Sequence, residues 1–154
     1  MKSTIRTFVL AAFAAATILA TAHSASAQMA FASTATTTTK TLAQNSRGTL
    51  MALILPNAGT YSLVGQQILD EAPGYASQTP VLCYTTNQAG GTAPLPYGPY
   101  SMATIPAEQG GYVTLPLNGY YTPTAPTEIW VECMYWGGAS VAALTGTITA
   151  TQVK

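Results

Sequence analysis

Apolar and polar residues alternate along most of the chain after residue 48, and a period of two predicts strands rather than helices. The clearest example is the stretch Thr127 to Trp136, TEIWVECMYW. Because neighbouring side chains of a strand point to opposite faces, we predict that the odd positions face the core. These are Ile129, Val131, Cys133 and Tyr135. The even positions then form an outward face, which is a candidate interaction face made of Glu128, Trp130, Glu132, Met134 and Trp136. The alternative is that the chain itself or its loops cover this face.

Similar short runs recur up to the C-terminus, separated by breaks rich in Gly and Pro. They predict about eight strands, at 49–55, 60–69, 81–86, 101–105, 112–117, 120–122, 128–136 and 141–153. No stretch has a helical period over a useful length. An all-β fold follows, and this number of antiparallel strands in one domain favours a two-sheet sandwich of jelly-roll or Greek-key type.

The N-terminus has a different pattern. Lys2 and Arg6 precede an apolar run from Phe8 to about Ala22, and small residues end the segment at Ala27. This arrangement is typical of a cleavable secretory signal, so residues 1–27 are expected to be removed. We therefore expect a secreted protein, located in the periplasm, at the cell surface or outside the cell. No second run is long enough to predict a transmembrane segment in the mature chain.

Residues 28–47 form a Thr-rich segment without a periodic apolar pattern. We interpret it as an extended arm or linker preceding a β-sandwich domain at 48–154. A run of β-branched residues can instead add a strand to the sheet edge of a neighbouring molecule, and this alternative stays open.

Charge narrows the choice of partners, because only 6% of the residues are charged. From Gly48 to Val153 the chain contains no Lys, Arg or His. Nucleic acids and anionic membranes are bound by clustered cations, so neither is an expected partner.

Two cysteines, Cys83 and Cys133, occupy inward positions of predicted strands. In an oxidising compartment we expect them to form one disulfide. Two buried free thiols are the alternative.

Catalysis is not expected. The one histidine, His23, lies in the signal segment, which excludes Ser-His-Asp, Cys-His and His-ligated zinc sites from the mature chain. Glu128 and Glu132 share a face but lie roughly 13 Å apart along a strand, beyond the roughly 5–9.5 Å used by glycosidases. Asp70 and Glu71 alone are a weak calcium candidate. We predict no cofactor and no metal.

Carbohydrate binding is the alternative to a protein-interaction module. Four tyrosines lie in predicted loops or a short strand and offer flat rings, as do Trp130 and Trp136; they are Tyr97, Tyr100, Tyr120 and Tyr121. A rigid surface covering and ordinary packing are the simpler explanations for these rings. A glycan or a surface protein is thus a possible partner.

The stretches 59–66 (GTYSLVGQ), 128–131 (EIWV) and 144–147 (LTGT) resemble the strand pattern of the tumour-necrosis-factor and complement-head jelly rolls. The chain also resembles uncharacterised bacterial secreted proteins of that plan, with one cysteine in each of two strands. The resemblance covers roughly 48–153 and implies a non-catalytic protein, mostly trimeric, that binds other macromolecules. The sequence therefore predicts a secreted structural or interaction module that forms a homo-oligomer.

Overall fold

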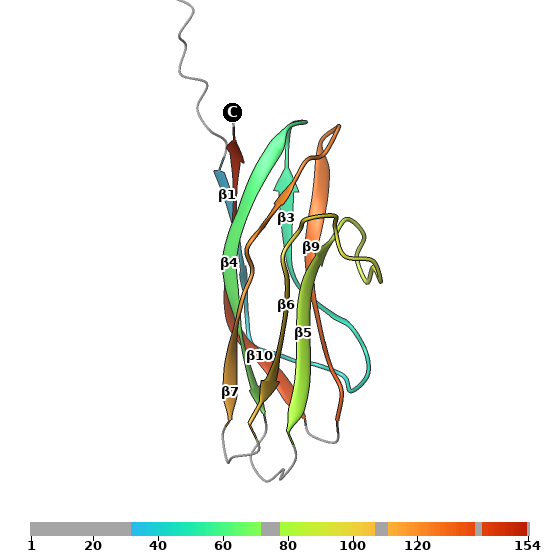
Figure 1. Cartoon of the computed structure of the whole chain (residues 1–154), viewed down its shortest axis with the longest axis vertical. Coiled ribbons are helices and arrows are strands. Elements are labelled where there is room, and N and C mark those ends of the chain that lie inside the picture. The colour runs from blue at the N-terminus through green and yellow to red at the C-terminus, as the bar shows by residue number, and fades with distance from the viewer. Residues whose placement is uncertain (1–31, 72–77, 107–110, 138–139, 154) are drawn as a thin grey trace, which may run out of the picture.

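The protein is all-β in the residues that the computed structural model describes, which are 32–71, 78–106, 111–137 and 140–153 (Figure 1). Ten strands are present there: β1 (Ala32–Thr37), β2 (Lys40–Thr41), β3 (Gly48–Leu55), β4 (Thr60–Glu71), β5 (Thr79–Thr86), β6 (Tyr100–Ile105), β7 (Tyr112–Pro116), β8 (Gly119–Tyr121), β9 (Thr127–Tyr135) and β10 (Val141–Val153). The eight strands expected from the sequence correspond to β3 through β10. The predicted signal, 1–27, lies outside the described residues.

The strands form two antiparallel sheets packed face to face. The six-stranded sheet has the order β1-β10-β4-β7, with β2 also paired to β10 and β8 also paired to β4. The four-stranded sheet has the order β3-β9-β5-β6. If β2 is set aside and β7 and β8 are taken as one interrupted strand, this is the strand order of an eight-stranded jelly roll. The predicted fold class is confirmed.

The Thr-rich segment supplies two of these strands, contrary to the linker interpretation. β1 pairs antiparallel with β10 over its whole length, from Ala32 opposite Thr151 to Thr37 opposite Gly146. Ala35 packs against the core from this strand. Thr has high β propensity, so a Thr-rich run without an apolar period still forms an edge strand when a partner strand is available. Residues 32–37, which precede position 48, are therefore part of the sandwich.

A polar network inside the sandwich ties β1 to its neighbours. Gln67 of β4 is fully buried, and its side-chain oxygen accepts a hydrogen bond from the Thr37 hydroxyl at 3.0 Å. Its amide nitrogen donates to the carbonyl of Thr145, beside the irregularity in the β4–β10 register. Gly146 faces Gln67 with no space for a side chain, because an added Cβ would lie 2.1 Å from the Gln67 Oε1. A paired buried amide costs little, whereas an unpaired one is expensive, so the network favours this register.

The core lies between the sheets and includes the disulfide. Cys83 of β5 and Cys133 of β9 are directly opposite each other, are fully buried and are bonded, with their Cα atoms 4.2 Å apart. The predicted pairing is confirmed. Around it lie the inward residues predicted for β9, namely Ile129, Val131 and Tyr135.

Candidate functional site

The outward face of β9, expected to be an interaction surface, is divided into a covered part and an open part. Glu132 lies in the covered part and is fully buried. One of its carboxylate oxygens, Oε1, accepts hydrogen bonds from the Thr49 hydroxyl at 2.6 Å and from the Gly90 backbone N–H at 2.8 Å. Glu132, named as part of the candidate interaction face, is therefore covered by its own chain and does not lie on an exposed surface. It holds a loop of its own chain.

That loop, residues 87–99, connects β5 to β6 and folds back over the four-stranded sheet. Gly91 approaches Thr86 so closely that a Cβ would lie 2.3 Å from the Thr86 hydroxyl oxygen. Gly90 has a positive φ of 68°, which glycine adopts without strain. The Gly90-Gly91 pair thus lets the loop backbone reach the sheet. The sequence leaves covering of this face by loops open, but the alternation along β9 does not indicate which residues are covered or which loop covers them.

Tyr84 lies next to Glu132 in the sheet register and belongs to the same covered part. Its hydroxyl donates a hydrogen bond to the Gly91 carbonyl at 2.7 Å. Burial raises the pKa of Tyr84 above its usual value of 10.0; the charge and a hydrogen bond of Arg47 oppose the rise, and the Glu132 charge adds to it. Glu132, Tyr84, Thr49 and Gly90 therefore form a polar latch, with Arg47 at its solvent side.

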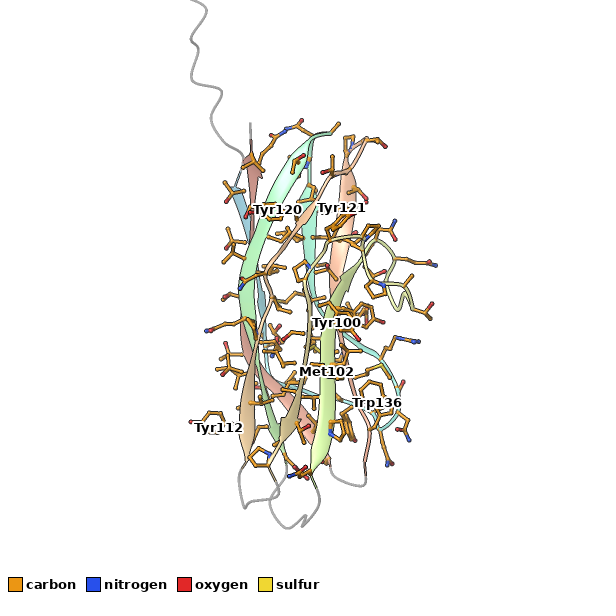
Figure 2. All side chains as sticks on the ribbon, viewed as in Figure 1. Tyr100, Met102, Tyr112, Tyr120, Tyr121 and Trp136 are labelled. Carbon is orange, nitrogen blue, oxygen red and sulfur yellow. A yellow bond between two sulfur atoms is a disulfide. The ribbon has the colours of Figure 1, made fainter. Side chains whose placement is uncertain are left out.

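The open part of the same face is apolar. Met102 of β6, Leu82 of β5 and Met134 of β9 lie in one row across three neighbouring strands. We call this row together with Tyr100 and Trp136 the apolar patch; Figure 2 shows Tyr100, Met102 and Trp136 along one side of the molecule. Met102 is 65% exposed, Tyr100 58% and Trp136 37%, whereas Leu82 is buried beneath its neighbours.

The patch brings together residues that are candidates from two separate parts of the sequence. Met134 and Trp136 came from the predicted face, and Tyr100 came from the predicted aromatic loops. Met102 was not predicted, although it lies two residues from Tyr100 on the same strand and therefore faces the same side of the sheet. The other face candidates contribute less, since Trp130 and Glu128 are half-buried opposite Ala52 and Ile54 of β3.

The remaining tyrosine candidates also include partly buried and exposed side chains. Tyr121 of β8 is partly buried and packs against the core, whereas Tyr120 faces outward and is 57% exposed. Tyr97 is 90% exposed at the end of the 87–99 loop. The Tyr120 backbone N–H donates to the Tyr97 carbonyl at 2.8 Å, so these two residues are neighbours in space. The sequence could not show that these two residues are neighbours.

The described residues contain no group of three or more His, Cys, Asp or Glu side chains that could hold a metal ion. Two carboxylates there are buried, Glu71 and Glu132, and each has one oxygen without a hydrogen-bond partner. Glu71 accepts a hydrogen bond from the Thr79 hydroxyl. In the part of the chain that is described, no helix is long and apolar enough to cross a membrane.

Comparison with known proteins identifies the fold. No protein family matches the chain, and neither does any curated protein. The structure of Eiger TNF from S. frugiperda matches 79% of this chain and 92% of its own, with a TM-score of 0.52 and 8% sequence identity. The structure of infectious bursal disease virus, Gx strain, matches 80% of this chain with a TM-score of 0.50 and 14% identity.

This chain spans only 32% of the length of the viral chain. At such identities the likeness shows the fold alone. The resemblance to tumour-necrosis-factor jelly rolls inferred from the sequence is confirmed at that level.

Proposed function

We propose that the protein is a secreted, non-catalytic structural module that self-associates through the apolar patch. The observation that carries this proposal is the exposure of Met102 and Tyr100 beside Trp136 on a regular sheet face. The core of a protein interface is typically aromatic or Met-rich and depleted of charge. Secretion is supported by the disulfide, which persists in oxidising compartments.

The absence of charged side chains from the patch favours a second copy as its partner. In a two-fold symmetric interface the same patch of both copies meets, so a patch that carried charges of one sign would repel its own copy. None of the five patch residues is charged. A trimer is what the jelly-roll resemblance implies, and its heterologous contacts would bury the same surface against a neighbouring one.

The area of the patch sets the strength of the contact. With about 200 Å² for each fully exposed large side chain, its three exposed members present on the order of 300 Å². Burying this area contributes roughly 8 kcal/mol per protomer, against association costs of about 4–15 kcal/mol. A stable interface buries about 800 Å² per partner. We therefore expect association in the micromolar range or weaker unless residues around the patch add to it.

The test is the mass of the mature chain, measured by size-exclusion chromatography with light scattering over a series of concentrations. We expect the wild-type protein to have a multiple of the protomer mass. Met102→Lys should have the mass of the monomer, because the variant places positive charges from both copies in the interface. Val64→Lys is the matched control, since Val64 is 58% exposed, close to the 65% of Met102, and lies on a strand of the other sheet, β4. A monomeric wild-type protein, or equal effects of the two variants, would contradict the proposal.

A further inference from the structure

Tyr97 has a backbone conformation that its side chain makes unfavourable. Its φ is +58°, and the other described non-glycine residue with a positive φ is Asn45, a residue type that tolerates this region. The Tyr97 ring is 90% exposed, so it gains almost nothing from packing within its own fold. Glycine would satisfy the backbone without strain. The fold therefore explains the conformation at position 97 but gives no reason for an aromatic side chain there.

The loop that carries this ring contacts strands of both sheets. The backbone N–H groups of Leu95 and Thr85 donate to the carbonyls of Thr85 and Pro99, which fixes the loop to β5. Gly98 has no space for a Cβ, which would lie 2.6 Å from the Thr85 hydroxyl oxygen. On the other side, a Cβ on Gly119 of β8 would lie 2.6 Å from the Tyr97 carbonyl oxygen. The strained residue is thus fixed between β5 and β8.

Tyr120 adds a second ring beside this fixed loop. Its backbone N–H donates to the Tyr97 carbonyl, and its side chain is 57% exposed. Figure 2 shows it on the strand segment next to Tyr121, well separated from Tyr112 and from the apolar patch. Asn118 is exposed one residue before Gly119 and offers an amide donor and acceptor. Two exposed rings and an exposed amide therefore lie on adjoining backbone.

We propose that Tyr97 and Tyr120 form a binding platform for a neutral polysaccharide. A tyrosine ring offers an apolar face to the C–H groups of a sugar and a hydroxyl to its oxygens. Strain of this kind persists at ligand-binding positions because a preformed site loses less entropy on binding. This inference concerns a different surface from the apolar patch and does not depend on self-association.

Charge decides against other partners that stack on aromatic rings. Single-stranded nucleic acids need a cationic groove beside the rings, yet residues 48–153 contain no Lys, Arg or His. The same lack of cations disfavours acidic polysaccharides. Around the platform, residues 78–106 and 111–127 contain no charged side chain at all, which suits a neutral ligand.

The experiment titrates three soluble neutral probes, cellohexaose, maltohexaose and chitohexaose, into the mature protein by calorimetry. We expect at least one to bind, with affinity lowered about tenfold or more by Tyr97→Gly and by Tyr120→Ala, as for the loss of a stacked ring. Tyr97→Gly should keep or raise the thermal midpoint, because it removes strain. A loss of binding without a loss of stability distinguishes a ligand residue from a structural one.

Two matched controls complete the design. Tyr112→Ala removes an exposed ring from an ordinary strand position, and Asn45→Gly relieves the other positive φ; both should retain binding. Met102→Lys should also retain it, so failure of self-association and failure of the platform can be told apart. Absence of binding to all three probes, or binding insensitive to Tyr97→Gly, would overturn the proposal. A change in oligomer mass in Tyr97→Gly would instead assign the platform to protein contact.

Discussion

At the scale of single residues, alternation along a strand predicts which way a side chain points but does not predict what covers it. The odd positions of β9, predicted to face the core, are all buried. The inward position of Cys133 was one of the grounds for predicting the disulfide. Glu132 nevertheless points outward and is fully buried, because the 87–99 loop returns over it. That contact joins residues 42 positions apart, and local pattern carries no information about it. The same limit applies to Tyr97, whose strain is visible only in the folded backbone.

The polar latch makes a prediction about alkaline stability. Because burial raises the pKa of Tyr84, the folded state keeps a proton that the unfolded state releases. The stability from this effect is complete below the unfolded pKa of 10.0 and is lost as the pH rises through the folded pKa. We expect Tyr84→Phe to weaken this fall in the free energy of unfolding, whose slope is at most about 1.4 kcal/mol per pH unit for one proton.

Urea unfolding of both proteins at a series of pH values from neutral to strongly alkaline measures this difference. Below pH 10 the Phe variant should be less stable by about 1 kcal/mol, for the lost hydrogen bond to Gly91. Tyr112→Phe, at an exposed ring, is the control and should leave the slope unchanged. Parallel curves for wild type and Tyr84→Phe would show that Tyr84 does not cause the alkaline loss.

At the scale of elements, strands with an alternating pattern were predictable and the Thr-rich strand was not. β3 through β10 each alternate apolar and polar residues or have turn residues at both ends. Their existence could therefore be predicted from the alternation and from the Gly-rich and Pro-rich breaks between them. β1 has a composition that suits both a linker and an edge strand. Its place is decided by tertiary pairing with β10, which local sequence cannot specify.

The role of β1 can be tested at Ala35, an apolar side chain of this strand that packs against the core. Ala35→Asp should lower the free energy of unfolding by about 2 kcal/mol, because a charge would be placed at the edge of the apolar interior. Thr38→Asp is the matched control, since Thr38 is exposed and follows the strand. Chemical denaturation measures both. If the two variants are equally stable, residues 32–37 do not contribute to the sandwich in solution.

At the scale of the whole molecule, the strand order is that of a jelly roll, and one disulfide joins the two central strands of the four-stranded sheet. β5 and β9 are the two inner strands of the four-stranded sheet, and Cys83–Cys133 joins them where they pair directly. The sequence separation is 50 residues, so the bond encloses β6, β7, β8 and the 87–99 loop. The apolar patch, the polar latch and the Tyr97 platform all include residues from this closed loop.

Reduction of the disulfide is therefore expected to destabilise the entire sandwich. Closing a loop of this length restricts the unfolded chain and stabilises the fold by about 4 kcal/mol, a large share of the roughly 5–15 kcal/mol typical of a domain. Denaturant unfolding with and without a thiol reductant should show this difference in one cooperative transition. The Cys83→Ala, Cys133→Ala double variant should resemble the reduced protein and should not respond to the reductant. If reduction leaves the transition unchanged, the stability comes from sheet packing alone, and the link is dispensable once the two strands have paired.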